Sequence, residues 1–168
     1  MATIRKATTA DVAEISLVLM ASWKAECRGI VNDAYLDSLR DDHWVEYLDA
    51  GIINETIFTF VMEEEGRIIG VVVMGNGEEE NEAHLISFYL LPEKIGQGKG
   101  HTLYSHVEKY LKNRGFSACK LDVLKGNARA IKFYEDHGYC DTKTVIYAML
   151  GEEEYSCLVY EKDLSANN

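Results

Sequence analysis

The segment from Gly96 to Gly100 has three glycines in five residues, and it constrains this chain more than any other feature. It follows an apolar run, His84 to Leu91, that stops at Pro92, and it leads into apolar residues at helical spacing. A strand, a glycine-rich turn and a helix starting near Gly98 place unpaired backbone N–H groups and the positive end of a helix dipole at one point. Such a point binds phosphate, because glycines have no side chain to keep the anion away from the amides. Glycines also adopt the left-handed backbone angles that such loops require.

Two better-known phosphate loops do not fit this segment. A Walker A loop needs a lysine followed by serine or threonine, whereas Lys99 is followed by Gly100. A dinucleotide-binding fingerprint needs a third glycine where His101 stands, although Asp122 lies at a suitable distance for the acidic residue that binds the ribose. A fragment of a nucleotide-binding oxidoreductase is also disfavoured by hairpins where βαβ units are required. A merely flexible turn remains an alternative interpretation.

The patterns on either side of the loop predict one domain of strands and helices. Apolar residues at three-to-four spacing indicate helices, and runs rich in β-branched and aromatic residues indicate strands. The expected order is strand, two helices, three strands, helix, strand, helix and two strands, without an internal repeat. The predicted strands are Thr3 to Ala7, Thr56 to Met62, Arg67 to Met74, His84 to Leu91, Phe116 to Leu124, Tyr139 to Met149 and Tyr155 to Lys162. The predicted helices are a segment capped by Thr8 or Thr9 and continuing to Trp23, Ala34 to Leu48, Gly98 to Gly115 and Ala128 to His137.

Composition limits both the size and the partners of this domain. A chain of 168 residues with 47% hydrophobic content buries one core and is too short for two ordinary domains. The balance of 17 basic against 28 acidic residues gives a net charge of −11, which argues against nucleic acid as a partner. Much of the acid lies in Glu63 to Glu65, Glu78 to Glu82 and Glu152 to Glu154. These stretches are either solvated turns or a field that attracts cationic substrates.

The cysteines and the early apolar residues indicate the cellular setting. Cys27, Cys119, Cys140 and Cys157 are spread along the chain without a C-x-x-C pair, so we expect neither a disulfide framework nor a metal site. The longest early apolar run, Ile15 to Trp23, follows acidic rather than basic residues, so neither a signal peptide nor a membrane span is expected. A reduced, cytoplasmic location fits best.

Two motifs carry a family resemblance. The segment from Leu90 to Gly100, LLPEKIGQGKG, resembles motif A of the GNAT acetyltransferase superfamily, in which glutamine or arginine is followed by two variable residues, glycine, a variable residue and glycine or alanine. Gly98 and Gly100 match, whereas Ile95 stands where the family has glutamine or arginine. Because that position acts largely through its backbone amide, pyrophosphate binding is expected to survive. Whether Ile95 weakens it is left open. The resemblance implies cofactor contacts from Ile95, Gly96, Gln97, Gly98, Lys99, Gly100 and His101.

The segment from Asn127 to Tyr139, NARAIKFYEDHGY, resembles motif B of the same superfamily at every defined position. The two motifs stand in the family's order and cover roughly residues 83–140. The resemblance implies an α/β GNAT fold, a mixed and largely antiparallel twisted sheet of about seven strands flanked by four helices, with strands 4 and 5 splayed. It also implies a single N-acetyltransferase domain over residues 1–164, followed by a frayed tail at 165–168.

The implied activity is transfer of an acetyl group from acetyl-CoA to a primary amine, by direct attack in a ternary complex. The backbone from Tyr89 through Leu90 to Leu91 is expected to pair with the pantetheine amides in the gap between the splayed strands. Asn127 matches the residue that hydrogen-bonds the cofactor arm, and a plain helix N-cap is the alternative. A non-catalytic acyl-CoA-binding or sensing domain is the competing function, since it would keep the loop without needing Tyr134.

Tyr134 matches the family's general acid, because a phenol can protonate the departing thiolate. A packed core aromatic is the alternative. His84 stands where related histone acetyltransferases carry a glutamate base, and strand alternation predicts that it shares a face with Ile86, Phe88 and Leu90. A surface histidine, with deprotonation of the amine through water, is the alternative.

Acceptor recognition in this fold falls to the connection between the first two helices, here Trp23 to Tyr35. Trp23, Glu26, Arg28 and Tyr35 are candidates to line a pocket, although Trp23 also continues an apolar helix face. The acceptor is expected to be a small-molecule or peptide amine, with the acidic charge favouring a small cationic amine or polyamine. Neither nucleic acid nor membrane is an expected partner, and the sequence leaves open whether the chain is a homodimer.

Overall fold

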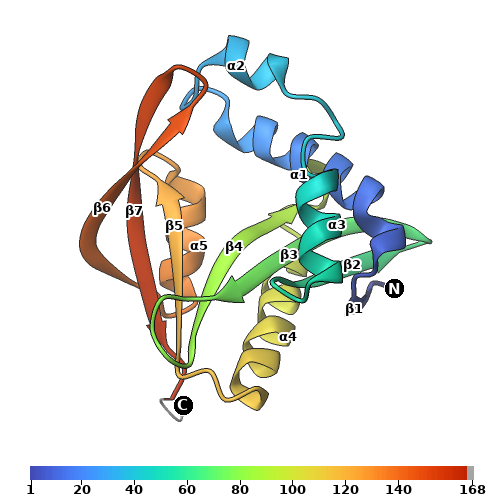
Figure 1. Cartoon of the computed structure of the whole chain (residues 1–168), viewed down its shortest axis with the longest axis vertical. Coiled ribbons are helices and arrows are strands. Elements are labelled where there is room, and N and C mark those ends of the chain that lie inside the picture. The colour runs from blue at the N-terminus through green and yellow to red at the C-terminus, as the bar shows by residue number, and fades with distance from the viewer. Residues whose placement is uncertain (166–168) are drawn as a thin grey trace.

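The computed structural model describes residues 1–165 and contains a mixed sheet flanked by helices on both faces (Figure 1). The strands are β1 (Thr3–Lys6), β2 (Phe58–Glu64), β3 (Arg67–Asn76), β4 (Glu82–Leu90), β5 (Ala118–Leu124), β6 (Cys140–Leu150) and β7 (Glu153–Asp163). The α-helices are α1 (Val12–Cys27), α2 (Asp33–Ser38), α3 (Val45–Ile53), α4 (Lys99–Asn113) and α5 (Ala128–Asp136). Within the described residues the seven strands lie in the order β1-β2-β3-β4-β5-β7-β6.

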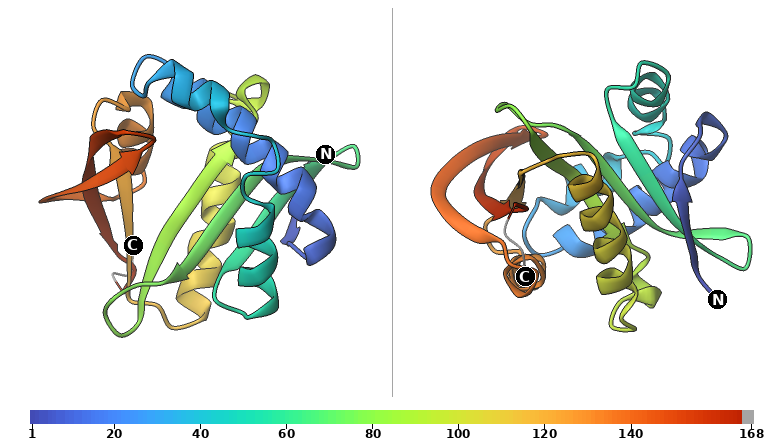
Figure 2. Two further views of the ribbon diagram at one scale, coloured as in Figure 1. Left: turned by 45° about the horizontal axis from the view of Figure 1, so that its top comes forward. Right: turned by 90° about the horizontal axis from the view of Figure 1, so that it is seen from below.

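The interior strand β3 is apolar along most of its length because helices cover both faces of the sheet. Val72 packs in a cluster with Leu103 of α4, whereas Val71 and Val73 pack with Ile15 of α1. Figure 2 shows α4 on one side of the sheet and α1 with α3 on the other. The alternation of β3 therefore builds two apolar layers that hold α1 and α4 in fixed positions against β4.

The predicted helix from Ala34 to Leu48 is instead two helices, α2 and α3. The backbone leaves the helix at Leu39, which is extended, and the connection is fixed by α1. The buried hydroxyl of Ser16 donates to the carbonyl oxygen of Asp41 at 2.6 Å and accepts from the N–H of Trp44 at 3.2 Å. The structure thus has five α-helices in the described residues where four were predicted.

Strand β4 contains a bulge that the sequence pattern did not reveal. Ser87 pairs with Val73 and Leu85 pairs with Met74, so Ile86 is an extra residue. The bulge breaks the alternation, and Leu85, Phe88 and Leu90 all belong to the apolar cluster on the α4 side. The prediction that His84 shares a face with Phe88 and Leu90 is therefore wrong, because the side chains on either side of Ile86 are out of phase.

The fourth and fifth strands separate, as expected for the splayed pair. β4 and β5 are parallel and pair only from Glu82 opposite Ala118 to Leu85 opposite Leu121. Beyond Leu85 the two strands diverge, and α5 follows β5 on the α4 side of the sheet (Figure 1). A gap therefore opens inside the sheet, along the second half of β4.

The chain end is described only as far as Ser165. The N–H and the hydroxyl of Ser165 both donate to Oδ1 of Asp163, at 2.8 and 2.6 Å. The predicted frayed tail is thus bonded at its first residue, and its remaining positions, 166–168, lie outside the described residues.

Candidate active site

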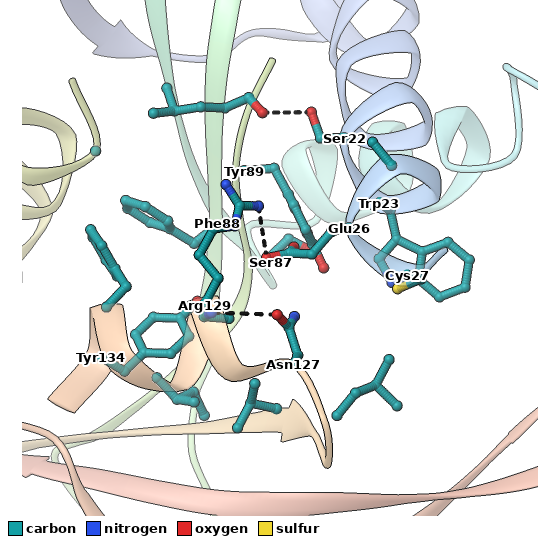
Figure 3. Close-up of a pocket in the computed structure, with 18 of the residues that line it drawn as sticks. Ser22, Trp23, Glu26, Cys27, Ser87, Phe88, Tyr89, Asn127, Arg129 and Tyr134 are labelled. Carbon is teal, nitrogen blue, oxygen red and sulfur yellow. Dashed lines mark hydrogen bonds and ion pairs between the residues drawn. The ribbon is translucent and has the colours of Figure 1, made fainter. Parts of the chain in front are cut away.

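A cleft of about 1170 Å³ lies where β4 and β5 separate. Side chains from α1, β4 and α5 converge on it (Figure 3). It is polar at several points and otherwise apolar, as ligand-binding clefts are. Its walls include Ser22, Trp23, Glu26, Cys27, Arg28, Leu85, Ser87, Phe88, Tyr89, Leu90, Ile95, Gly96, Gly98, Gly100, His101, Asp122, Asn127, Arg129, Phe133, Tyr134 and Cys157.

The glycine loop forms one end of this cleft and has the geometry of an anion site. Gly96 and Gly98 have φ angles of 79° and 77°, and a Cβ atom on either would meet no atom within 4 Å. The open space above them would allow a phosphate to approach the backbone amides. The first intrahelical bond of α4 runs from Thr102 to Gly98, so the preceding N–H groups are without helical partners. Gly100 is needed for packing, since a Cβ there would lie 3.3 Å from Phe133.

The two polar side chains of the loop point away from the cleft. Gln97 donates to the carbonyl oxygen of Glu93, and Lys99 donates to Oε1 of Gln97, each at 3.0 Å. Lys99 also lies 3.5 Å from the carboxylate of Glu64, which pairs with Lys94 as well. Gln97 and Lys99, both predicted to contact the cofactor, are therefore absent from the lining of the cleft.

His101 lines the cleft in the first turn of α4. Its Nδ1 lies 3.0 Å from Nε2 of His137, and Nδ1 of His137 lies 2.7 Å from the carbonyl oxygen of Phe133. Because that carbonyl accepts, Nδ1 of His137 carries a proton, and in its neutral form Nε2 accepts from His101. The ring of His101 is thereby oriented at the edge of the phosphate loop.

At the end of β4 only part of the predicted backbone segment reaches the cleft. Tyr89 and Leu90 line it, and the carbonyl oxygen of Leu90 accepts from the hydroxyl of Ser22 at 2.9 Å. The N–H of Leu91 donates to Ile69 of β3 at 2.9 Å, and Leu91 is not among the residues that line the cleft. Leu91 therefore anchors the end of the strand rather than facing a ligand.

Two motif B residues, Asn127 and Tyr134, lie on the α5 side of the cleft. The side chain of Asn127 accepts from the N–H of Ala130 at 3.3 Å, so it is an N-cap, and it also lines the cleft. Burial, and next the negative charge of Glu26, raise the pKa of the Tyr134 phenol. Tyr134 therefore stays protonated at neutral pH, as a proton donor must.

Glu26 is predicted from the sequence only to line a pocket, whereas in the structure its largely buried carboxylate pairs with the exposed guanidinium of Arg129. Its Oε1 accepts from Nη2 of Arg129 at 3.2 Å, and its side chain is 12% exposed. A sequence signal was available: Ile15, Leu19, Ser22 and Glu26 follow helical spacing on one face, and a carboxylate on such a face is unusual.

A smaller cavity of about 230 Å³ adjoins the cleft on the α1 side of β4. The two share Trp23, Ile86, Ser87, Tyr89 and Leu150. The lining of the smaller cavity is mainly aromatic and aliphatic, and it consists of Leu19, Trp23, Tyr35, Leu39, His43, Trp44, Ile86, Ser87, Tyr89 and Leu150.

The candidate substrate residues divide between these spaces. Trp23 lines both cavities, and Tyr35 lines the smaller one, with its ring edge-on to Trp23 at 6.2 Å. Arg28 lies at the cleft, but its guanidinium is paired with Asp33 and Asp37 and is exposed. Trp23 and Tyr35 are therefore placed to contact a ligand, and Arg28 is held by α2.

His84 lines neither of the two cavities. Its Nε2 lies 3.4 Å from Oδ2 of Asp122, and this hydrogen bond raises the pKa of the imidazole against the opposing effect of burial. A histidine whose pKa is raised is more often already protonated at neutral pH, and so is less available to accept a proton from an amine. The geometry thus favours a structural ion pair at His84.

This ion pair makes stability depend on pH. Because the folded-state pKa of His84 lies above its usual 6.5, the pair stabilises the protein fully below that value. The stabilisation disappears as pH rises through the folded-state pKa. We expect His84→Gln to lower the free energy of unfolding by less than about 1 kcal/mol at pH 6, because the pair is partly exposed, and by less at pH 8. Urea unfolding at both pH values measures this, with Asp122→Asn as a matched variant. A difference that does not change with pH would contradict it.

Comparison with known proteins gives this cleft its context. Residues 19–139 match the family model for acetyltransferases of the GNAT family. The chain belongs to the GNAT family. Its predicted fold is confirmed, including the splayed fourth and fifth strands, which the structure shows to be parallel. This GNAT protein is an acyltransferase.

Three similar proteins illustrate the relationship. The uncharacterized N-acetyltransferase YuaI of Bacillus subtilis (strain 168) is 29% identical over 142 residues, which cover 80% of this chain and 78% of the relative. A spermidine N(1)-acetyltransferase of Thermoplasma acidophilum is 29% identical over 141 residues, covering 81% and 86%. The crystal structure of the PaiA N-acetyltransferase of Thermoplasma acidophilum in complex with coenzyme A is 26% identical, covers 97% of this chain and 99% of that chain, and has a TM-score of 0.82. In residues 1–165 of this GNAT protein, every helix is too short or too polar to cross a membrane.

Proposed function

We propose that this GNAT protein transfers the acetyl group of acetyl-CoA to the primary amine of a small cationic acceptor such as a polyamine. The observation that carries the proposal is the single cleft that joins the glycine loop, Tyr134 and Glu26. The loop supplies amides for the pyrophosphate, Tyr134 supplies a proton, and Glu26 supplies a negative charge where an ammonium group would enter. The similarity to a structure that holds coenzyme A supports the choice of cofactor.

Direct attack in a ternary complex is favoured over a covalent intermediate. Of the cysteines, Cys27 and Cys157 line the cleft. Burial, with the charge of Glu26 next, raises the pKa of the Cys27 thiol to about 12, and burial also raises that of Cys157. A thiol that stays protonated is a poor nucleophile. The amine is therefore expected to attack the thioester itself.

The smaller cavity suits the remainder of a polyamine. Its aliphatic side chains can contact the methylene groups of a polyamine, and the aromatic rings of Trp23, Tyr35 and Trp44 can attract a second ammonium group. The similarity to a spermidine acetyltransferase supports this class of acceptor.

The acidic turn after β3 supports a cationic acceptor less than the sequence indicated. Glu78 to Glu80 are exposed, but the turn lies at the opposite end of β4 from α2 (Figures 1 and 2). Glu82 is buried and pairs with Lys120 at 3.0 Å. Any attraction from this turn therefore acts over a distance, through the net charge of −11.

Acetyl transfer to spermidine and to propylamine at low and moderate salt tests the proposal. We expect a higher kcat/KM for spermidine than for propylamine, and a KM for spermidine that rises more steeply with salt. The Debye length is about 10 Å at 0.1 M, so added salt weakens the attraction of the more highly charged amine to the acidic protein. Release of the coenzyme A thiol measures both rates. Equal salt dependence for the two amines would contradict the cationic preference, and no transfer to any amine would contradict the activity.

A further inference from the structure

An ion pair spans the cleft between α1 and α5. Glu26 lies near the end of α1 with 12% of its side chain exposed, and Arg129 lies in the first turn of α5 with 54% exposed. Both side chains line the cleft, with the guanidinium toward solvent and the carboxylate toward the protein interior (Figure 3). A buried carboxylate whose one cationic partner is exposed can exchange that partner for a positively charged group of a ligand.

The groups that face Glu26 define its chemistry. The side chains that interact with it are those of Arg129 and Tyr134 in α5, Asn127 at the N-cap of α5, Tyr89 in β4 and Cys27 in α1. Burial raises the pKa of the Glu26 carboxyl, while the charge of Arg129 and hydrogen bonds from Asn127 and Arg129 oppose the shift. The carboxylate charge in turn raises the pKa of both phenols, of Tyr89 and Tyr134, which places these groups within electrostatic range of one another.

We propose that Glu26 is a catalytic residue, which binds the ammonium group of the acceptor in place of Arg129 and removes its proton. This inference rests on the proposed function. An amine with a pKa near 10 is almost wholly protonated at neutral pH and cannot attack until a base takes a proton. Two carboxylates, Glu26 and Asp122, line the same cleft as Tyr134. Asp122 pairs with His84, which lies outside the cleft, so Glu26 is the candidate base.

The step balances in protons and electron pairs. Glu26 takes one proton from the ammonium group and later releases it to solvent. The nitrogen lone pair forms a bond to the acetyl carbon, and the carbon–sulfur bond breaks, with its electron pair leaving on sulfur. The thiolate takes the proton of Tyr134, and the phenolate is reprotonated by the second proton that the amine loses.

The test compares Glu26→Gln with the wild-type protein, using acetyl-CoA and spermidine. Glutamine keeps the shape and the hydrogen bonding of the side chain but cannot take the proton. We expect kcat/KM for spermidine to fall about tenfold or more at pH 7, with the dissociation constant of acetyl-CoA changed by less than about twofold. The difference in kcat/KM between the two proteins is expected to shrink toward pH 10, because much of the acceptor in solution is then already the unprotonated amine.

Arg129→Gln gives a second, independent readout. Its loss removes the positive charge that lowers the pKa of Glu26, so the acidic limb of the kcat/KM profile is expected to move to higher pH. The matched controls are Lys132→Gln and Asp136→Asn. These residues form an exposed ion pair at 2.8 Å on the same helix, outside the cleft. Neither control is expected to change the profile.

Calorimetry of spermidine with the protein loaded with coenzyme A separates the two hypotheses. We expect binding to weaken about tenfold in Glu26→Gln. Wild-type transfer to spermidine with an unchanged pH profile in Glu26→Gln would overturn the role of Glu26 and leave the proposed function standing. A wild-type protein that binds acetyl-CoA but acetylates no amine would overturn the proposed function. If the wild-type protein acetylates no amine, spermidine binding still tests Glu26. Equal binding by the wild-type protein and Glu26→Gln, or no binding by either, would then overturn the role of Glu26 as well.

Discussion

Tyr134→Phe is expected to slow turnover by about 10² to 10⁴-fold while the dissociation constant of acetyl-CoA changes by less than about twofold. The substitution removes the hydroxyl that protonates the thiolate and keeps the ring, which contacts Phe133 and Tyr139. Steady-state kinetics at saturating acceptor, together with calorimetry of acetyl-CoA, separate the two effects.

Tyr139→Phe is the matched control for this loss. Tyr139 lies edge-on to Tyr134 with ring centroids 5.6 Å apart, but it is buried outside the cleft and its hydroxyl lies 3.3 Å from that of Tyr104. Its loss costs about 1 kcal/mol of stability and leaves turnover nearly unchanged. Wild-type turnover in Tyr134→Phe, or an equal loss in both variants, would show that Tyr134 acts through packing.

Gly98→Val is expected to raise the dissociation constant of acetyl-CoA about tenfold or more, or about 1.4 kcal/mol. The valine side chain would occupy the open space above the loop and hold the pyrophosphate away from the amides of α4. It would also strain the backbone, because the φ angle of Gly98 is 77°. Calorimetry on the folded variant measures the loss.

Gly115→Val separates the loss of binding from the strain. Gly115 has a φ angle of 85°, and a Cβ there would also meet no atom within 4 Å, but it lies beyond the opposite end of α4. Both variants are expected to lose about 1–2 kcal/mol of stability. Only Gly98→Val is expected to lose affinity for acetyl-CoA. Equal affinity for acetyl-CoA in the two variants would show that the loop does not bind the cofactor.

The two motifs predicted the parts of the site that depend on local sequence. The glycine loop, the start of α4 and the cap at Asn127 each follow from residues within a few positions of one another. Local rules also placed Tyr134 on a helix that follows a strand, and the structure has that arrangement. Which side chains contact the acetyl-CoA remains a prediction.

The parts that the sequence did not reveal depend on contacts between distant segments. The split of the second helical region depends on Ser16, which bonds to Asp41 and Trp44, 25 and 28 positions away. The Glu26 and Arg129 pair joins residues 103 positions apart. The bulge at Ile86 is set by register against β3. Periodicity along one segment carries no information about such partners.

The short pairing of β4 with β5 has a thermodynamic consequence for ligand binding. Because β4 and β5 pair only as far as Leu85 and Leu121, the gap between them belongs to the fold itself. A cofactor that occupies this gap does not have to break backbone hydrogen bonds between the two strands. The cost falls on folding instead, since an interior sheet edge is left without a neighbouring strand. A cofactor whose amides complete that edge binds the folded chain and not the unfolded one, and so shifts the folding equilibrium toward the native state.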